Sequence, residues 1–175
     1  MNNIIVRHET RWDAHQIRSI TADLIKSAAH EDFQLPAEHL TIDLLRNERD
    51  LTLSLVAEYQ RFIVGHVALA PIAIEHDASS GPARPSWYGF SPLVVLPEFR
   101  QDGVGAELIE TGLDLLRHRG AAGCVALGSI DYYRRFGFAP AALRIGKIPP
   151  GYIVARCFDG PSPSGTVVDR SVFCV

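Results

Sequence analysis

The chain has 175 residues, of which 47% are hydrophobic and 21% are charged. This is ordinary globular composition, which excludes a disordered or low-complexity protein, and the length fits a single domain over residues 1–175. Twenty acidic and 17 basic side chains leave a net charge of −3. Since the sequence has no basic stripe, we expect no nucleic-acid partner.

The first half of the chain predicts a strand, two helices and a hairpin. Asn3–Arg7 is a β-rich run, and Arg11–Leu24 carries apolar residues at helical spacing. A second helix is predicted over Pro36–Leu45, because proline suits the first helical turn. Two strand-like runs, Leu51–Ala57 and Phe62–Ile74, are joined by four polar residues, which predicts an antiparallel hairpin.

The second half predicts a strand–helix–strand crossover followed by shorter elements. In chain order, the predicted segments are a loop at His76–Ser86, a strand at Trp87–Val95, a helix at Gly103–Arg119, a strand at Gly123–Leu127, one or two helical turns at Asp131–Phe136, a strand at Tyr152–Phe158, a loop at Asp159–Gly165 and a strand at Val167–Val175. The order βααβββαβαββ indicates an α/β domain with a mixed sheet.

Cysteine spacing and the apolar runs bear on metal sites, disulfides, membrane association and the cellular compartment. Cys124, Cys157 and Cys174 form no CxxC pair, so we expect neither a metal site nor a disulfide framework. Cys124 and Cys174 lie in apolar runs and are predicted to be buried. Met1–Trp12 does not resemble a signal peptide, and Phe62–Ile74 is too short to span a bilayer. The expectation is a cytoplasmic protein without a membrane partner.

The turn from Arg100 to Gly105, between a predicted strand and a predicted helix, has the features of an anion site. Gly103 and Gly105 remove Cβ atoms where backbone would approach a ligand. Free amides at a helix start carry about half a positive charge, and Arg100 adds a cationic side chain. A dinucleotide fingerprint is disfavoured because Leu108 replaces its third glycine, and the P-loop ending is absent. The alternative interpretation, a glycine-rich helix start that binds no ligand, stays open.

Two motifs in this order resemble the GCN5-related N-acetyltransferase (GNAT) superfamily. Residues 100–105 (RQDGVG) match its acetyl-CoA signature, Q/R-x-x-G-x-G/A, after a strand and before a long helix. Residues 132–138 (YYRRFGF) resemble its Y-x-x-x-G-F segment at the expected distance downstream. The element order over residues 3–140 also agrees, so the resemblance covers most of the chain. The run Leu127-Gly128-Ser129 ahead of the second motif resembles a bacterial subgroup of small predicted acetyltransferases.

The resemblance implies a mixed, mostly antiparallel twisted sheet with helices on both faces and a V-shaped cleft between the two central strands. Backbone amides from Gln101 to Ala106 would hold the pyrophosphate of acetyl-CoA, and the last residues of the preceding strand would pair with its pantetheine arm and polarise the thioester. The residues that the resemblance implies for this cosubstrate are Leu93, Val94, Val95, Arg100, Gln101, Asp102, Gly103, Val104, Gly105, Ala106 and Tyr133.

The resemblance also implies acetyl transfer from acetyl-CoA to a primary amine of a small molecule or peptide, without a metal. Tyr133 occupies the place of the general acid that protonates the departing thiolate, and Tyr132 is interpreted as structural. Two alternatives stay open. One is a non-catalytic acyl-CoA sensor or interaction module, and the other is a nucleotide-binding α/β protein. A homodimer through the C-terminal strands would fit the family.

Several roles near the predicted cleft stay open at this stage. Asp102 stands where many family members have glycine or a basic residue, and its carboxylate fits a helix cap. Arg134 and Arg135 fit either a contact with a CoA phosphate or a solvated helix face. No general base is assigned. His66, one candidate for that base, is interpreted as a packed histidine. The acidic candidates near the cleft are Glu58, Glu75, Glu98 and Asp131.

Overall fold

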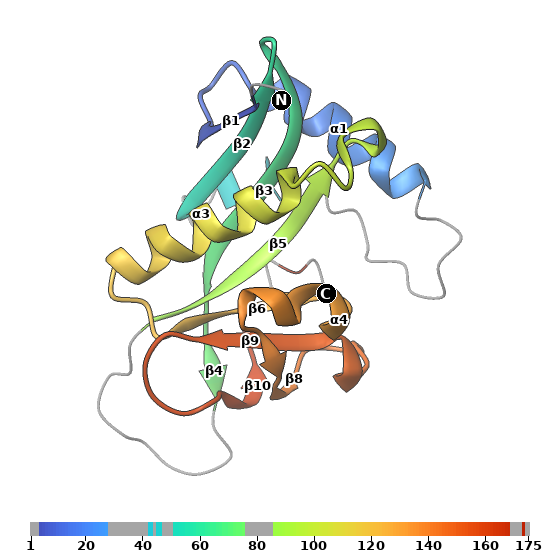
Figure 1. The fold of residues 1–175 in the computed structure, drawn as a ribbon. Helices are drawn as coiled ribbons and strands as arrows, with labels where there is room; N and C mark the ends of the chain where they lie inside the picture. Colours follow the sequence, from blue (N-terminus) through green and yellow to red (C-terminus); the bar gives the residue numbers. More distant parts are fainter. Residues whose placement is uncertain are drawn as a thin grey trace.

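The structure, a computed structural model, describes residues 4–27, 42–43, 45–46, 51–75, 86–168 and 173. Within these residues the strands form a seven-stranded sheet in the order β1-β2-β3-β5-β6-β9-β7 and a three-stranded sheet in the order β4-β10-β8 (Figure 1). The strands are β1 (Ile4–His8), β2 (Leu53–Tyr59), β3 (Phe62–Ile72), β4 (Ile74–Glu75), β5 (Trp87–Val95), β6 (Gly123–Leu127), β7 (Ala139–Pro140), β8 (Ala142–Arg144), β9 (Ile153–Cys157) and β10 (Ser164–Val167). The helices are α1 (Ala14–Ser27), α3 (Val104–His118) and α4 (Ile130–Tyr133), with 3-10 turns η1 (Pro97–Phe99), η2 (Arg134–Phe136) and η3 (Pro150–Tyr152).

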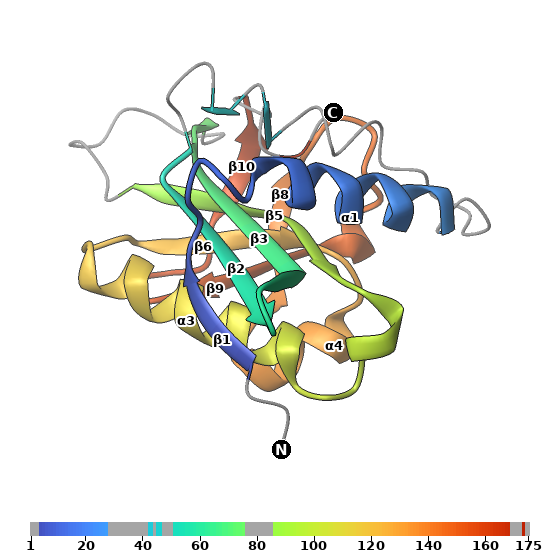
Figure 2. The same cartoon turned by 90° about the horizontal axis from the view of Figure 1, so that it is seen from above.

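The large sheet carries helices on both faces, as predicted. α3 crosses one face and α1 lies on the other (Figure 2). Buried side chains recur along α3 at helical spacing, and β3 is buried along almost its whole length because helices cover both of its faces. Its neighbours β2 and β5 both pair with it antiparallel, whereas β5 and β6 are parallel. The expected mixed, mostly antiparallel α/β sheet is confirmed.

The hairpin between β2 and β3 turns more tightly than predicted. The four-residue link shortens to Gln60 and Arg61, because β2 continues to Tyr59 and β3 starts at Phe62. Both turn residues have positive φ, 48° and 71°. Two positive φ values are typical of a type I′ turn, whose twist matches that of the paired strands. The polar side chains of the last strand residues concealed this continuation of β2.

The C-terminal strands also differ from the prediction. The last strand was expected over Val167–Val175, but β10 covers Ser164–Val167, so it begins in the predicted loop and ends at the first residue of the predicted strand. It pairs parallel to β8 and antiparallel to β4, so tertiary partners decide its position. β7 and β8 were not predicted, since two or three residues are too short to show a period of two. Residues 169–172 and 174–175 lie outside the described part of the chain.

Some predicted features fall largely outside the described residues. They are most of the helix Pro36–Leu45, of which residues 42, 43 and 45 are helical as expected, most of the loop His76–Ser86, and Cys174. Residue 46, just beyond the predicted end of that helix, is helical as well. Cys124 is fully buried, as predicted, and burial raises the pKa of its thiol. In the described ranges, no helix is long and apolar enough to cross a membrane.

β5 separates from β6 halfway along its length. The two strands pair from Trp87–Phe90 to Gly123–Ala126, and β5 then continues to Val95 paired with β3 alone. Between Val67 and Leu69 of β3 the register shifts, because β5 carries one extra residue there. An extra residue bends a strand and increases its local twist. The two central strands therefore diverge beyond this point, which opens the expected V-shaped cleft.

Candidate functional site

A cavity of about 700 Å³ opens where β5 separates from β6. Its walls are the end of β5, the loop and first turn of α3, and the connection from β6 into α4. The predicted site residues that line it are Leu93, Val95, Arg100, Gln101, Gly103, Gly105, Ala106 and Tyr133. Phe99, Gly128, Ser129, Tyr132 and Arg135 complete its lining. Two motifs about thirty residues apart in the sequence therefore face one cavity.

The last residues of β5 present backbone groups to this cleft. The Leu96 N–H donates to the Val64 carbonyl of β3, with an N–O distance of 2.9 Å. Backbone groups of alternate strand residues point to the same edge, so those of Val94 also face β3. Those of Leu93 and Val95 consequently face the cleft. This strand edge is unpaired, because β6 has already diverged from it.

The loop before α3 is shaped by two residues with positive φ, Gln101 at 69° and Gly103 at 86°. Gly103 is the N-cap of α3, and no side chain caps the helix. The N–H groups of residues 104–106 therefore have no acceptor within the helix. Arg100 lies at the cleft edge, where its Nε donates to the Val95 carbonyl over 3.2 Å. A Cβ on Gly103 would contact nothing within 4 Å, so the backbone conformation, rather than close approach, favours glycine there.

Gly105 differs from Gly103, because its surroundings are crowded. A Cβ atom built on Gly105 would lie 2.7 Å from the Tyr132 hydroxyl oxygen. The Tyr132 hydroxyl thus lies next to the first turn of α3. Its ring is contacted on one side by the Arg135 guanidinium, 4.6 Å from the ring centroid. Tyr132, interpreted from the sequence as structural, is therefore a cleft residue beside the free amides.

Tyr133 is held more tightly than its neighbour and is only 6% exposed. Its ring packs against Tyr132 and Phe138, with centroid distances of 5.1 Å to each. Gly128 lies beneath the ring, since a Cβ there would come within 2.9 Å of Cε2 of Tyr133. These contacts fix the Tyr133 ring at the cleft wall. The same wall holds Ser129, whose hydroxyl caps α4 by accepting from the Asp131 N–H.

Three predicted site residues do not line the cleft. The Val94 side chain is 1% exposed and packs with apolar residues of α1 on the other face of the sheet. Val104 is 2% exposed and belongs to the core beneath α3. Asp102 is exposed, and its carboxylate makes no cap hydrogen bond to α3. The helix-cap interpretation of Asp102 was therefore wrong, because the N-cap position falls on Gly103.

The five candidates for a general base also lie away from the cleft lining. Glu58 forms an ion pair with Arg7, with an O–N distance of 2.7 Å. His66 is fully buried, which agrees with its interpretation as a packed histidine. Glu75, Glu98 and Asp131 are exposed. Among the described residues, none of the five contributes to the cavity wall.

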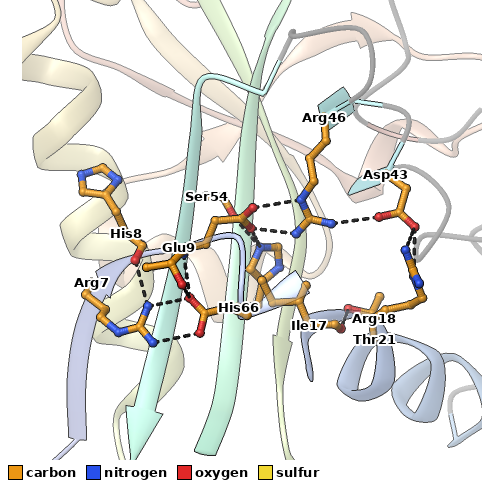
Figure 3. A network of polar contacts seen from close by, with 12 residues as sticks. Arg7, His8, Glu9, Ile17, Arg18, Thr21, Asp43, Arg46, Ser54 and His66 are labelled. Atoms are coloured by element: carbon orange, nitrogen blue, oxygen red, sulfur yellow. Dashed lines mark hydrogen bonds and ion pairs between the residues drawn. The ribbon is translucent and has the colours of Figure 1, made fainter. Parts of the chain in front are cut away.

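A network of ion pairs ties the opposite face of the sheet to α1 (Figure 3). Arg46 donates to both carboxylate oxygens of Glu9 over 2.9 and 2.8 Å, and to Asp43 over 2.9 Å. Asp43 also accepts from Arg18 of α1, at 3.0 and 2.8 Å. Bidentate arginine–carboxylate contacts are directional, so they fix residues 43 and 46 relative to the sheet and to α1. Sequence reasoning missed this network, because Glu9 and Arg46 are 37 residues apart and share no motif.

The buried end of this network contains Ser54 and His66. The Ser54 hydroxyl contacts Glu9, and its oxygen lies 2.7 Å from Nε2 of His66. A carboxylate only accepts, so Ser54 donates to Glu9 and accepts the Nε2–H of His66. Nδ1 of His66 has no hydrogen-bond partner within the described residues. A buried N–H at that atom would be unsatisfied, which favours the neutral imidazole with its proton on Nε2.

The pKa values agree with this arrangement. Burial lowers the pKa of His66, and Arg46 lowers it further, despite the neighbouring Glu9. Burial by itself raises the pKa of Glu9, but the contacts with His66, Arg46 and Ser54 outweigh it and lower that pKa to about 2. Asp13, the residue before α1, binds Arg7 through two contacts of 2.7 and 3.0 Å, and its pKa is also lowered to about 2.

Comparison with known proteins agrees with the cleft and the fold. The acetyltransferase (GNAT) family profile matches residues 17–138. The chain is 34% identical over 124 residues to the uncharacterized N-acetyltransferase YhbS of Escherichia coli, covering 70% of this chain and 71% of that protein. A crystal structure of a GNAT family acetyltransferase from Brucella melitensis, in complex with acetyl-CoA, is 37% identical, with a TM-score of 0.76 over 95% of this chain and 96% of that one.

The E. coli YhbS structure in complex with CoA also superimposes, with a TM-score of 0.77 and 26% identity over 95% of this chain and 89% of that one. The family profile covers well over half of the chain, and it spans the divergence of β5 from β6, the loop before α3 and the paired tyrosines. The chain therefore belongs to the GNAT family of acetyltransferases.

Proposed function

We propose that this protein transfers the acetyl group of acetyl-CoA to a primary amine of a small molecule or peptide, with Tyr133 as general acid. The observation that carries the proposal is the cleft itself. An unpaired strand edge, uncapped helix amides and a buried tyrosine converge on one cavity of about 700 Å³. The acetyl-CoA and CoA complexes of the two similar structures support this use of the cleft.

The residues present fit the cosubstrate. The N–H groups of residues 104–106 and the positive end of the α3 dipole suit a pyrophosphate, and Arg100 at the rim adds a charge. The backbone groups of Leu93 and Val95 suit the amides of a pantetheine arm, because an unpaired strand edge offers N–H and C=O groups with which an extended chain can pair. In this proposal, the cleft side of β5 binds the acyl end of acetyl-CoA, and the loop before α3 binds its phosphates.

The proposed reaction needs a stabilised oxygen and a protonated leaving group. The amine nitrogen bonds to the thioester carbon while the carbon–sulfur bond breaks. During the attack, before the thiolate has left, an N–H of Leu93 or Val95 stabilises the negative charge that develops on the carbonyl oxygen, and the carbonyl re-forms as the carbon–sulfur bond breaks. The departing thiolate takes the Tyr133 hydroxyl proton, and the amine proton leaves to solvent, from which Tyr133 is reprotonated. Holding amine and thioester together supplies much of the rate enhancement.

Release of free CoA thiol from acetyl-CoA, measured across an amine library, tests the proposal. The expected result is amine-dependent thiol release by the wild-type protein and an acetylated amine of matching mass. If the protein binds acetyl-CoA but no amine releases thiol, it is a non-catalytic acyl-CoA sensor or interaction module instead. If acetyl-CoA does not bind at all, the assignment of the cleft is wrong.

A further inference from the structure

A second groove, with a volume of about 450 Å³, lies beside the proposed acetyl-CoA cleft. It is bounded by the exposed side of α3, by η2 and by β9. Its charged lining residues are Arg117, Arg134, Arg135, Arg156, Glu110 and Asp114. Four arginines against two acids leave this small surface with an excess of positive charge, although the whole chain is acidic. Such a local excess attracts anions.

Most of this positive charge is not neutralised within the groove. Arg117 pairs with Asp114, with an N–O distance of 3.1 Å. Within the described part of the chain, no carboxylate lies within ion-pair distance of Arg134, Arg135 or Arg156. Three guanidinium groups without a carboxylate partner in one groove can together bind an anion that comes from outside the chain, because guanidinium groups match carboxylate and phosphate oxygens in charge and geometry.

Two of these guanidinium groups are held in place by the chain. Arg135 stacks on the rings of Tyr132 and Phe136, 4.6 and 4.7 Å from their centroids, which leaves its N–H edge free to donate. Arg156 donates from Nη1 to the Gly137 carbonyl over 3.1 Å. A Cβ on Gly137, whose φ is 78°, would lie only 1.4 Å from that Nη1. Glycine at this position therefore lets Arg156 reach the groove.

The groove continues from the proposed phosphate-binding end of the cleft. Arg135 lines both cavities. Glu110, at the near end of the groove, is seven residues beyond Gly103, which is about 10 Å along the helix at 1.5 Å per residue. In CoA, the ribose that follows the pyrophosphate carries a phosphate on its 3′ oxygen. A pyrophosphate at the first turn of α3 therefore brings that phosphate within reach of this groove.

We propose that the groove formed by Arg134, Arg135 and Arg156 binds the 3′-phosphate of acetyl-CoA and makes the protein selective for CoA over dephospho-CoA. A phosphate monoester carries a charge of about −1.5 to −2 at pH 7 and offers three acceptor oxygens, which planar guanidinium groups match well. The inference rests on the proposed function, because it needs acetyl-CoA in the neighbouring cleft. It assigns the second arginine of the YYRRFGF motif to the cosubstrate rather than to a solvated face.

Isothermal titration calorimetry with CoA, dephospho-CoA and inorganic phosphate tests this inference. The wild-type protein should bind CoA at least about tenfold more tightly than dephospho-CoA, since one charge-assisted contact is worth about that factor. In Arg135→Gln and in the double variant Arg134→Gln/Arg156→Gln, the ratio of CoA affinity to dephospho-CoA affinity should fall towards one, mainly because CoA binds more weakly. Arg119→Gln is the matched control, because Arg119 is an exposed arginine near the end of α3 that does not line the groove. The ratio of CoA affinity to dephospho-CoA affinity in Arg119→Gln should match that of the wild-type protein.

Equal binding of CoA and dephospho-CoA by the wild-type protein would overturn the inference while leaving the proposed function intact. So would a ratio that stays unchanged in both arginine variants, provided that circular dichroism shows them folded. Inorganic phosphate that binds at the groove without affecting the CoA ratio would assign the groove to a separate phosphate ligand and would also overturn it. Failure of both CoA forms to bind would instead contradict the proposed function.

Discussion

Tyr132 and Tyr133 are adjacent in the sequence but meet different surroundings. The Tyr132 hydroxyl lies beside the first turn of α3, close to where a Gly105 Cβ would be, and the residue is 36% exposed. Tyr133 is 6% exposed and its ring is held over Gly128 at the cleft wall. Two neighbouring side chains of one short helix meet different surroundings, so in the proposed function Tyr132 would lie at the phosphates and Tyr133 at the reacting end.

Removing the Tyr133 hydroxyl tests its proposed role as general acid. Tyr133→Phe should lower turnover about 10²–10⁴-fold, because the thiolate then leaves without a positioned proton, while CoA affinity stays nearly unchanged. Steady-state kinetics with an accepted amine, together with calorimetric CoA binding, separate these two effects. Tyr132→Phe is the comparison, and it should weaken CoA binding more than it lowers turnover. Unchanged turnover in Tyr133→Phe would contradict the assignment.

A side chain at Gly105 should block the cleft. In Gly105→Val the new Cβ would meet the Tyr132 hydroxyl oxygen at 2.7 Å, and its methyl groups would project where the proposed pyrophosphate lies. CoA affinity should fall at least about tenfold, which calorimetry measures directly. Gly151→Val is the matched control, because a Cβ on that glycine meets nothing within 4 Å. If Gly105→Val binds CoA as the wild type does, the amides of α3 do not hold the phosphates.

At the scale of elements, the polar network in Figure 3 joins parts that the hydrophobic core alone would leave less precisely placed. Glu9 follows β1, Ser54 and His66 belong to β2 and β3, and Arg46 connects them to Asp43 and thus to α1. The side chain of Arg46 is 20% exposed and that of Glu9 is 17% exposed. Removing one partner of such a pair leaves the other charge partly buried and unpaired, which costs stability.

The buried His66 should make folding stability depend on pH. Its folded-state pKa is lowered by burial, so the unfolded chain takes up a proton near pH 6.5 that the folded chain does not. Stability is therefore full above that pH and falls as the pH drops towards the folded pKa, by up to about 1.4 kcal/mol per pH unit. Urea unfolding at pH 5, 6, 7 and 8 measures this slope. The slope of stability against pH should flatten in His66→Gln. It should persist in His15→Gln, because His15 is exposed.

Glu9 should contribute to a second dependence of stability on pH, in a more acidic range. Its folded pKa of about 2 lies below the ordinary value of a glutamate, so its stabilising contribution is present above about pH 4.5 and is lost as the pH falls towards 2. Glu9→Gln should lower stability at pH 7 and reduce the further loss of stability between pH 5 and 2. Equal acid sensitivity of the variant and the wild type in urea unfolding would show that Glu9 is not stabilised by Arg46 and Ser54.

At the scale of the whole molecule, ligand binding should stabilise the fold selectively. A ligand at a hundred times its dissociation constant adds about 2.7 kcal/mol, which raises the melting temperature of a chain of this length by about 5–10 °C. Thermal unfolding with acetyl-CoA, CoA, NAD and ATP in parallel measures this effect. Acetyl-CoA and CoA should each shift the melting temperature, and NAD and ATP should not. A shift with NAD or ATP alone would favour the nucleotide-binding interpretation.

The sequence by itself determined the local features of this protein. Glycine spacing at residues 103 and 105, the apolar stripe of α3 and the YYRRFGF segment are short-range patterns, so they identified the family, the fold class and most of the cleft lining. Leu93, Val95 and Tyr133 were predicted by residue number and do line the cavity.

The tertiary structure alone decided the features that depend on contacts between distant residues. Val94 was predicted beside Leu93 and Val95, but strand alternation together with pairing to β3 turns it away from the cleft. The network around Glu9 and Arg46, and the groove in which Arg156 meets η2, join residues with no shared motif. Strand pairing and burial set these positions, and no window of neighbouring residues encodes them, because the free energy that fixes them comes from packing across the sheet.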